Sequence, residues 1–147
     1  MQRHFAGAYV VAAIDLLAGG PLAIFVLLFS PQLFRQPNVH LDDYLAFAAM
    51  AVTGTVSVGA AIVTLLHRSV SYGVLRKARI SAVVSDLYML VTGVAMWIIA
   101  RQRGGDWAGL GLLGALLFIA VGTSLLLLSL LMLRYMRRMR PVSTATL

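Results

Sequence analysis

Hydrophobic residues fall into four long runs that are separated by short polar segments. Each run is at least 21 residues long, and the runs cover residues 6–29, 44–66, 80–100 and 107–134. At ~1.5 Å of rise per residue, about 20 residues cross the ~30 Å hydrocarbon core of a bilayer as an α-helix. The pattern therefore predicts four transmembrane helices. Residues 125–128 are consecutive leucines, which argues against the alternating pattern of a transmembrane β-barrel.

The segments between the runs are too short to form extramembrane domains. They cover residues 30–43, 67–79 and 101–106, and are 14, 13 and 6 residues long. Short connections make consecutive helices antiparallel neighbours. We therefore expect an all-α integral membrane protein with a single domain over residues 1–147. Its four helices are expected to form an up-and-down bundle, followed by a basic tail at 135–147.

Composition supports a membrane protein and disfavours other classes. Hydrophobic residues make up 61% of the chain, charged residues only 12%, and the mean hydropathy is +0.91. Soluble domains are about 45–50% apolar, so a soluble monomer is excluded. The formal net charge of +7 does not indicate nucleic-acid binding, because the basic residues lie between the apolar runs and form no stripe along one surface.

Lys and Arg are distributed unequally between the two ends of the predicted helices. Nine lie in the N-terminal segment, the second connection and the tail, whereas three lie at the other end. The positive-inside rule then predicts that both termini face the cytoplasm. The tail contributes Arg134, Arg137, Arg138 and Arg140, which we expect to anchor it at the membrane surface. The excess of Arg over Lys, eleven to one, indicates a GC-rich bacterial genome, and helical spans place the chain in the inner membrane.

Two carboxylates lie inside the predicted spans, Asp15 and Asp86. The other acids, Asp42, Asp43 and Asp106, come directly before a span, where they are expected to cap its first turn. An Asp near the bilayer midplane costs ~2.5–3.5 kcal/mol. Asp15 shares helical spacing with a stripe of small residues and is expected to face protein. Since no Lys or Arg was assigned inside a span, we expect Asp15 to have no salt-bridge partner within the chain.

A candidate polar site surrounds Asp15. The sequence Gly19-Gly20-Pro21 is expected to interrupt the first helix and free the Leu17 carbonyl beside this carboxylate. Thr53 and Ser57 occupy one face of the second span and could supply hydroxyl partners. Three roles stay open for Asp15: structural hydrogen bonding, contact with a polar group on another subunit, and ion or proton coupling.

Asp86 is expected about 9 Å from the cytoplasmic start of the third span, as an interfacial ion pair or a functional gate. In the fourth span, Gly111, Ala115 and Gly122 lie on one side and predict a helix-packing face, with a Leu-rich surface left for lipid or a partner.

No catalytic or cofactor signature occurs in the sequence. The chain has no Cys, and its three His do not pair within the spans; His4 and His67 lie at span ends. We therefore expect no haem, no metal, no other cofactor and no enzyme activity.

Two functions remain. The first is a non-catalytic accessory or structural subunit of a larger membrane complex, with an energy-converting or transport role. The alternative is a small homo-oligomeric ion- or proton-coupled transporter or channel that uses Asp15 beside the helix break. The expected partners are the lipid bilayer and either other membrane subunits or further copies of the chain, and not nucleic acid.

Overall fold

Four α-helices make up the computed structural model, which describes residues 6–33, 35, 41–66, 71–103 and 108–138. The helices are α1 (Ala6–Leu33), α2 (Leu41–Leu65), α3 (Tyr72–Arg103) and α4 (Ala108–Arg138). Each is long and apolar enough to cross a membrane. The predicted class, an all-helical protein with four candidate membrane spans, is therefore confirmed.

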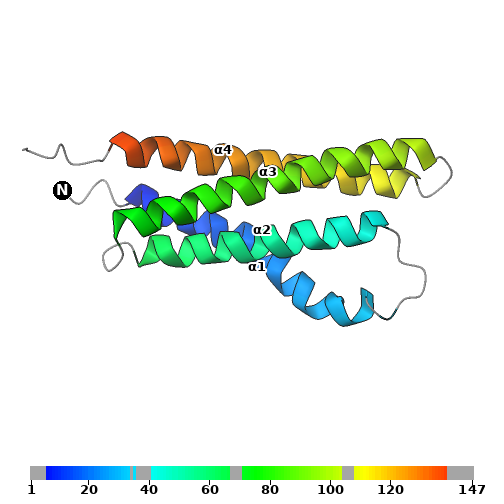
Figure 1. Ribbon diagram of the computed structural model, residues 1–147, viewed down its shortest axis with the longest axis horizontal. Coiled ribbons are helices and arrows are strands. Elements are labelled where there is room, and N and C mark those ends of the chain that lie inside the picture. The colour runs from blue at the N-terminus through cyan, green and yellow to red at the C-terminus, as the bar shows by residue number, and fades with distance from the viewer. Residues whose placement is uncertain (1–5, 34, 36–40, 67–70, 104–107, 139–147) are drawn as a thin grey trace, which may run out of the picture.

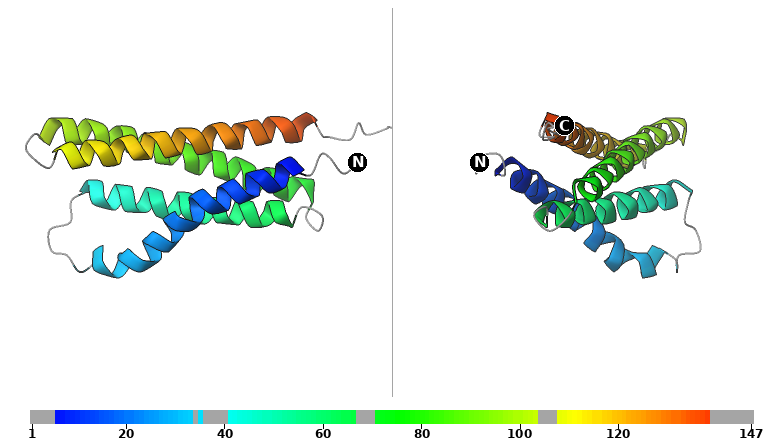
Figure 2. Two further views of the ribbon diagram at one scale, coloured as in Figure 1. Left: turned by 180° about the vertical axis from the view of Figure 1, so that it is seen from behind. Right: turned by 60° about the vertical axis from the view of Figure 1, so that its left-hand side comes forward.

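Consecutive helices run in opposite directions, so that α1 begins and α4 ends at the same end of the molecule (Figure 1). We call this the near end and the opposite one the far end. The helices pack in chain order, α1 on α2, α2 on α3 and α3 on α4, whereas α1 and α4 make only slight contact. At the near end, Val11 of α1 packs against Met132 and Met136 of α4. Towards the far end α1 crosses obliquely and diverges from α4 (Figure 2).

The largest difference from the predicted runs concerns α3, which begins at Tyr72, eight residues before the expected start at Ile80. Arg76, Lys77 and Arg79 are therefore helical, although the sequence analysis placed them in a connection. Arg76 and Lys77 are exposed, while Arg79 is buried. A helix start placed after the last charged residue misses these first turns of α3, because a helix can carry charges on its exposed face.

The expected interruption of the first helix is wrong, since α1 continues through both Pro21 and Pro31. Pro21 still cannot donate to the Leu17 carbonyl. However, Leu17 follows Asp15 by two residues, which puts it about 200° around the helix, and it is 75% exposed whereas Asp15 is buried. The two residues therefore do not form one site. At Pro31 the carbonyl left without its helical donor is that of Leu27, and the Ser30 hydroxyl donates to it at 3.5 Å.

Glycines allow the closest contacts between neighbouring helices. On α1 and α2, a Cβ atom at Gly54 would lie 2.7 Å from the backbone nitrogen of Ala23. On α3 and α4, a Cβ atom at Gly122 would lie 2.9 Å from the backbone nitrogen of Leu90. Such backbone proximity is typical of transmembrane helix pairs.

The small residues predicted to form a packing face on α4 lie against α3. A Cβ atom at Gly111 would contact Ala100, Ala115 is fully buried, and Gly122 meets Leu90. This face is therefore used within the chain.

We predict that Gly122→Ala destabilises the protein by about 1–3 kcal/mol, because the added methyl group overlaps the α3 backbone. Gly114→Ala is the matched control: nothing lies within 4 Å of its Cβ position, and the better helix propensity of Ala should leave stability unchanged or raise it by up to about 1 kcal/mol. Unfolding by dodecyl sulfate titration in maltoside micelles measures both. Equal midpoints for the two variants would contradict the close α3–α4 contact.

Candidate functional site

Buried polar side chains come from all four helices, although most of each helix surface is apolar. Those described are Asp15 on α1, Thr53, Ser57 and Thr64 on α2, Arg79, Ser85, Asp86 and Thr92 on α3, and Ser129 on α4. Burial of ionisable groups at membrane depth is costly and requires partners. Their contacts therefore define the candidate site.

Arg79 forms the centre of this cluster. Its Nη1 donates to the Asp15 Oδ2 at 2.5 Å, and the side chains of the two residues are 0% and 4% exposed. Its Nη2 donates to the Thr64 Oγ1, also at 2.5 Å. The Thr64 hydroxyl in turn donates to the Ala60 carbonyl at 2.7 Å. One guanidinium on α3 therefore holds α1 by an ion pair and α2 by a hydrogen bond.

The expectation that Asp15 lacks a salt-bridge partner within the chain is wrong. It failed because Arg79 was counted among the charges of a connection, whereas α3 starts early and turns this side chain inward. A signal was present in the sequence: Arg79 shares helical spacing with Asp86, Met89 and Gly93, all of which are buried. The inward orientation expected for Asp15 is confirmed, since the residue is 3% exposed.

Asp86 joins α4 to the cluster. The Ser129 hydroxyl donates to its Oδ2 at 2.8 Å, and Asp86 interacts electrostatically with both Asp15 and Arg79. Because α3 begins at Tyr72, Asp86 lies fourteen residues, or about 21 Å, from the start of the helix. The interfacial depth expected for Asp86 stays a prediction, but its side chain is buried among the helices, at 1% exposed.

Two buried atoms of this cluster, the Arg79 Nε and the Asp86 Oδ1, have no hydrogen-bond partner among the described residues. The cluster contains two carboxylates and one guanidinium, so its charges do not cancel when all three are ionised.

The residues predicted to form one polar site are not all together. Thr53 donates to the Ser85 carbonyl at 3.1 Å between α2 and α3, and Ser57 lies against Gly19 between α2 and α1. Pro21 is exposed and joins neither of these contacts. The hydroxyl that contacts the Asp15–Arg79 pair is that of Thr64, which accepts a hydrogen bond from Arg79 and lies on the same face of α2 as Thr53 and Ser57.

An apolar groove runs along the diverging helices α1 and α4. It consists of two adjoining pockets, each of about 410 Å³, which share Ala18 and Val121. We call it the α1–α4 groove. Its further lining residues are Ile14, Leu17, Pro21, Leu22 and Phe25 on α1, Met50 on α2, and Ala120, Ser124, Leu125 and Leu128 on α4.

Several predicted residues lie outside what the structure describes. These are His4, His67 and Arg140; Arg137 and Arg138 belong to the last turn of α4, but their side chains are not described. Arg134 is exposed. Within the described residues, no group of three or more His, Cys, Asp or Glu side chains could hold a metal ion.

Comparison with known proteins identifies no relative: no family model, no curated protein and no solved structure matches the chain. The functional argument therefore rests on the geometry described above.

We predict that Asp15→Asn lowers stability by about 3–5 kcal/mol, because it leaves the Arg79 charge buried without its counterion. Arg79→Met should be similarly harmful, while the double variant should lose much less than the sum of the two. Unfolding titrations of the four proteins form a double-mutant cycle. Lys77→Gln, which removes an exposed charge from the same helix as Arg79, is the control and should change little. Additive losses would show that the two side chains are not coupled.

Proposed function

We propose that the chain is a non-catalytic integral membrane subunit that binds a transmembrane helix of another membrane protein in the α1–α4 groove. The observation that carries the proposal is the groove itself, which none of the described residues covers between α1 and α4. Inside a bilayer, an apolar concave surface between helices is filled either by lipid or by another helix.

The shape of the groove favours a helix. Along α1 it extends from Ile14 to Phe25, eleven residues or about 16 Å, which is three helical turns. The small side chains of Ala18, Ala120 and Ser124 allow a partner backbone to approach closely.

The interior polar groups complement this interpretation. Arg79 supplies the counterion that Asp15 requires, so a partner need not provide a charge to neutralise it. Docking therefore depends on apolar packing in the groove.

The alternative, an ion- or proton-coupled homo-oligomeric transporter, rested on Asp15 beside a freed backbone carbonyl at a helix break. In the structure α1 is continuous, and Leu17 lies on the opposite side of this helix from Asp15. The Asp15 carboxylate accepts a hydrogen bond from Arg79. The geometry therefore gives the subunit the stronger support.

We predict that a photo-crosslinker at Val121, inside the groove, forms one dominant adduct in native membranes, attached to a transmembrane segment of another protein. The same group at Val84, an exposed position on α3, should react with lipid. Ala120→Leu should abolish the adduct by filling the groove, whereas Ala48→Leu on α2 should not. Mass spectrometry of the adduct identifies the attached segment. Lipid adducts alone at Val121 would refute helix docking.

We further propose a bacterial inner-membrane location, an up-and-down arrangement across the bilayer, and cytoplasmic termini. With Arg79 assigned to the interior, the near end still has the excess of basic residues. By position in the sequence, the segments next to the near end contain Arg3, Arg68, Arg76, Lys77, Arg134, Arg137, Arg138 and Arg140, and those next to the far end contain Arg35, Arg101 and Arg103.

This orientation predicts that alkaline phosphatase is inactive when fused after Leu147 and active when inserted after Gly104, because the enzyme matures only outside the cytoplasm. A fluorescent protein at the same two positions should give the reverse pattern. Phosphatase activity of the Leu147 fusion would overturn the proposed orientation.

A further inference from the structure

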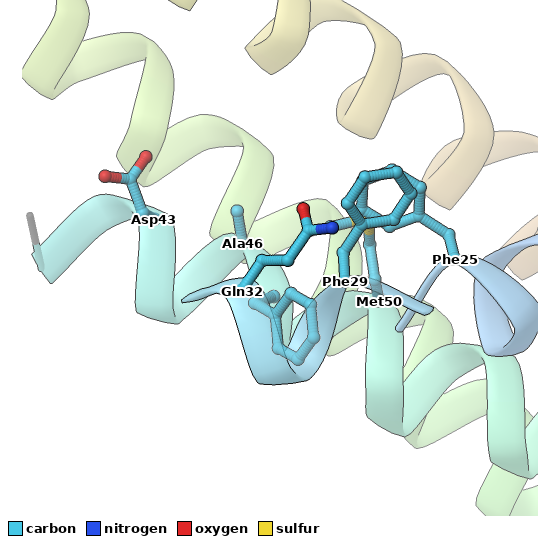
Figure 3. A pocket seen from close by; sticks show the side chains of 7 residues that line it. Phe25, Phe29, Gln32, Asp43, Ala46 and Met50 are labelled. Atoms are coloured by element: carbon cyan, nitrogen blue, oxygen red, sulfur yellow. The ribbon is translucent and has the colours of Figure 1, made fainter. Parts of the chain in front are cut away.

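A second pocket, of about 330 Å³, lies at the far end between the last turns of α1 and the first turns of α2. We call it the far-end pocket. Its lining residues are Phe25, Phe29, Gln32, Asp43, Ala46, Phe47 and Met50. Figure 3 shows the rings of Phe25 and Phe29 on one side, the Asp43 carboxylate on the other, and the Gln32 carboxamide between them.

The lining combines aromatic faces with one negative charge. The rings of Phe25 and Phe29 are stacked, with centroids 4.5 Å apart, and Phe47 adds a third ring. Aromatic faces attract cations, with ammonium groups as the typical ligand. The lining contains an acid and no Lys or Arg, in a chain whose formal net charge is +7. Its one ionisable side chain therefore has the sign that attracts a cation, opposite to the net charge of the chain as a whole.

The depth of the pocket adds a requirement for an apolar part. Gln32 lies in the last turn of α1 and Asp43 in the first turn of α2, and polar groups at the ends of membrane-spanning helices are expected near the lipid headgroups. Phe25 lies seven residues deeper, about 10 Å along α1. Phe25 and Met50 also line the α1–α4 groove, so the apolar surface continues from the far-end pocket towards the membrane interior.

We propose that the far-end pocket binds an amphiphile with a positively charged ammonium head. The head lies between the Asp43 carboxylate and the Phe25–Phe29 rings, and the apolar tail follows Phe25 and Met50 into the bilayer. The Gln32 carboxamide offers its oxygen to a protonated amine. The source of this chemistry is either an aminophospholipid headgroup or a free alkylammonium compound. The proposal does not depend on helix docking in the groove.

Native mass spectrometry of the full chain in maltoside micelles tests the proposal, because each bound molecule is resolved by its mass. The probes are dodecyltrimethylammonium, phosphatidylethanolamine, and phosphatidylglycerol with the same acyl chains. The chain should bind dodecyltrimethylammonium, and Asp43→Asn should weaken this binding about fivefold, as expected for one exposed charge pair. Asp106→Asn, which removes the same charge from the α3–α4 connection, should leave it unchanged.

Phe29→Leu keeps the pocket apolar but removes an aromatic face, and should weaken binding of the ammonium probe about threefold. Phe118→Leu on α4, outside the pocket, is its control. Binding of phosphatidylethanolamine that is lost in the Asp43 variant supports a lipid headgroup as the source; binding of the alkylammonium alone supports a free amphiphile. Phosphatidylglycerol reports binding at the basic near end and should be unaffected by either pocket variant. Wild-type affinity for the ammonium probe in either pocket variant would overturn the proposal.

Discussion

The arrangement of the helices depends on one fully buried guanidinium, that of Arg79. Arg79 cannot lose its charge under ordinary conditions, so it has to be compensated by carboxylate and hydroxyl groups from other helices. Asp15 on α1 and Thr64 on α2 supply these groups, and Asp86 extends the polar contacts to Ser129 on α4. Apolar burial provides little preference for one helix pairing over another in lipid, whereas these directional contacts accept only one arrangement.

The same contacts explain why the two ends of the molecule differ. Asp15, Thr64 and Arg79 lie in the half of their helices towards the near end, where Val11 also meets Met132 and Met136. Beyond Gly19, α1 is held mainly by α2, and its far half diverges from α4 (Figure 2). The α1–α4 groove follows from this divergence.

The sequence was sufficient to predict the four spans, the inward orientation of Asp15 and the small-residue face of α4, because each depends on a periodicity within one segment. It was not sufficient for the partner of Asp15. A span that is defined by the absence of charge cannot contain Arg79. In the structure, however, α3 begins before its apolar part, and its first turns include the exposed residues Arg76 and Lys77. The two pockets could not be predicted either, since they depend on the angle at which α1 crosses its neighbours.

The Asp15–Arg79 pair is better understood as a device for specificity than as a source of stability. Replacing a buried ion pair by apolar residues of similar volume is often neutral or stabilising, while removing one partner is costly. An apolar pair at these positions would tolerate sliding or rotation of α1, but the ion pair fixes its register against α3 and, through Thr64, against α2. Fixing the register of α1 at one end also sets where its far half lies. The shape of the proposed docking groove is therefore determined by a charge pair that does not line it.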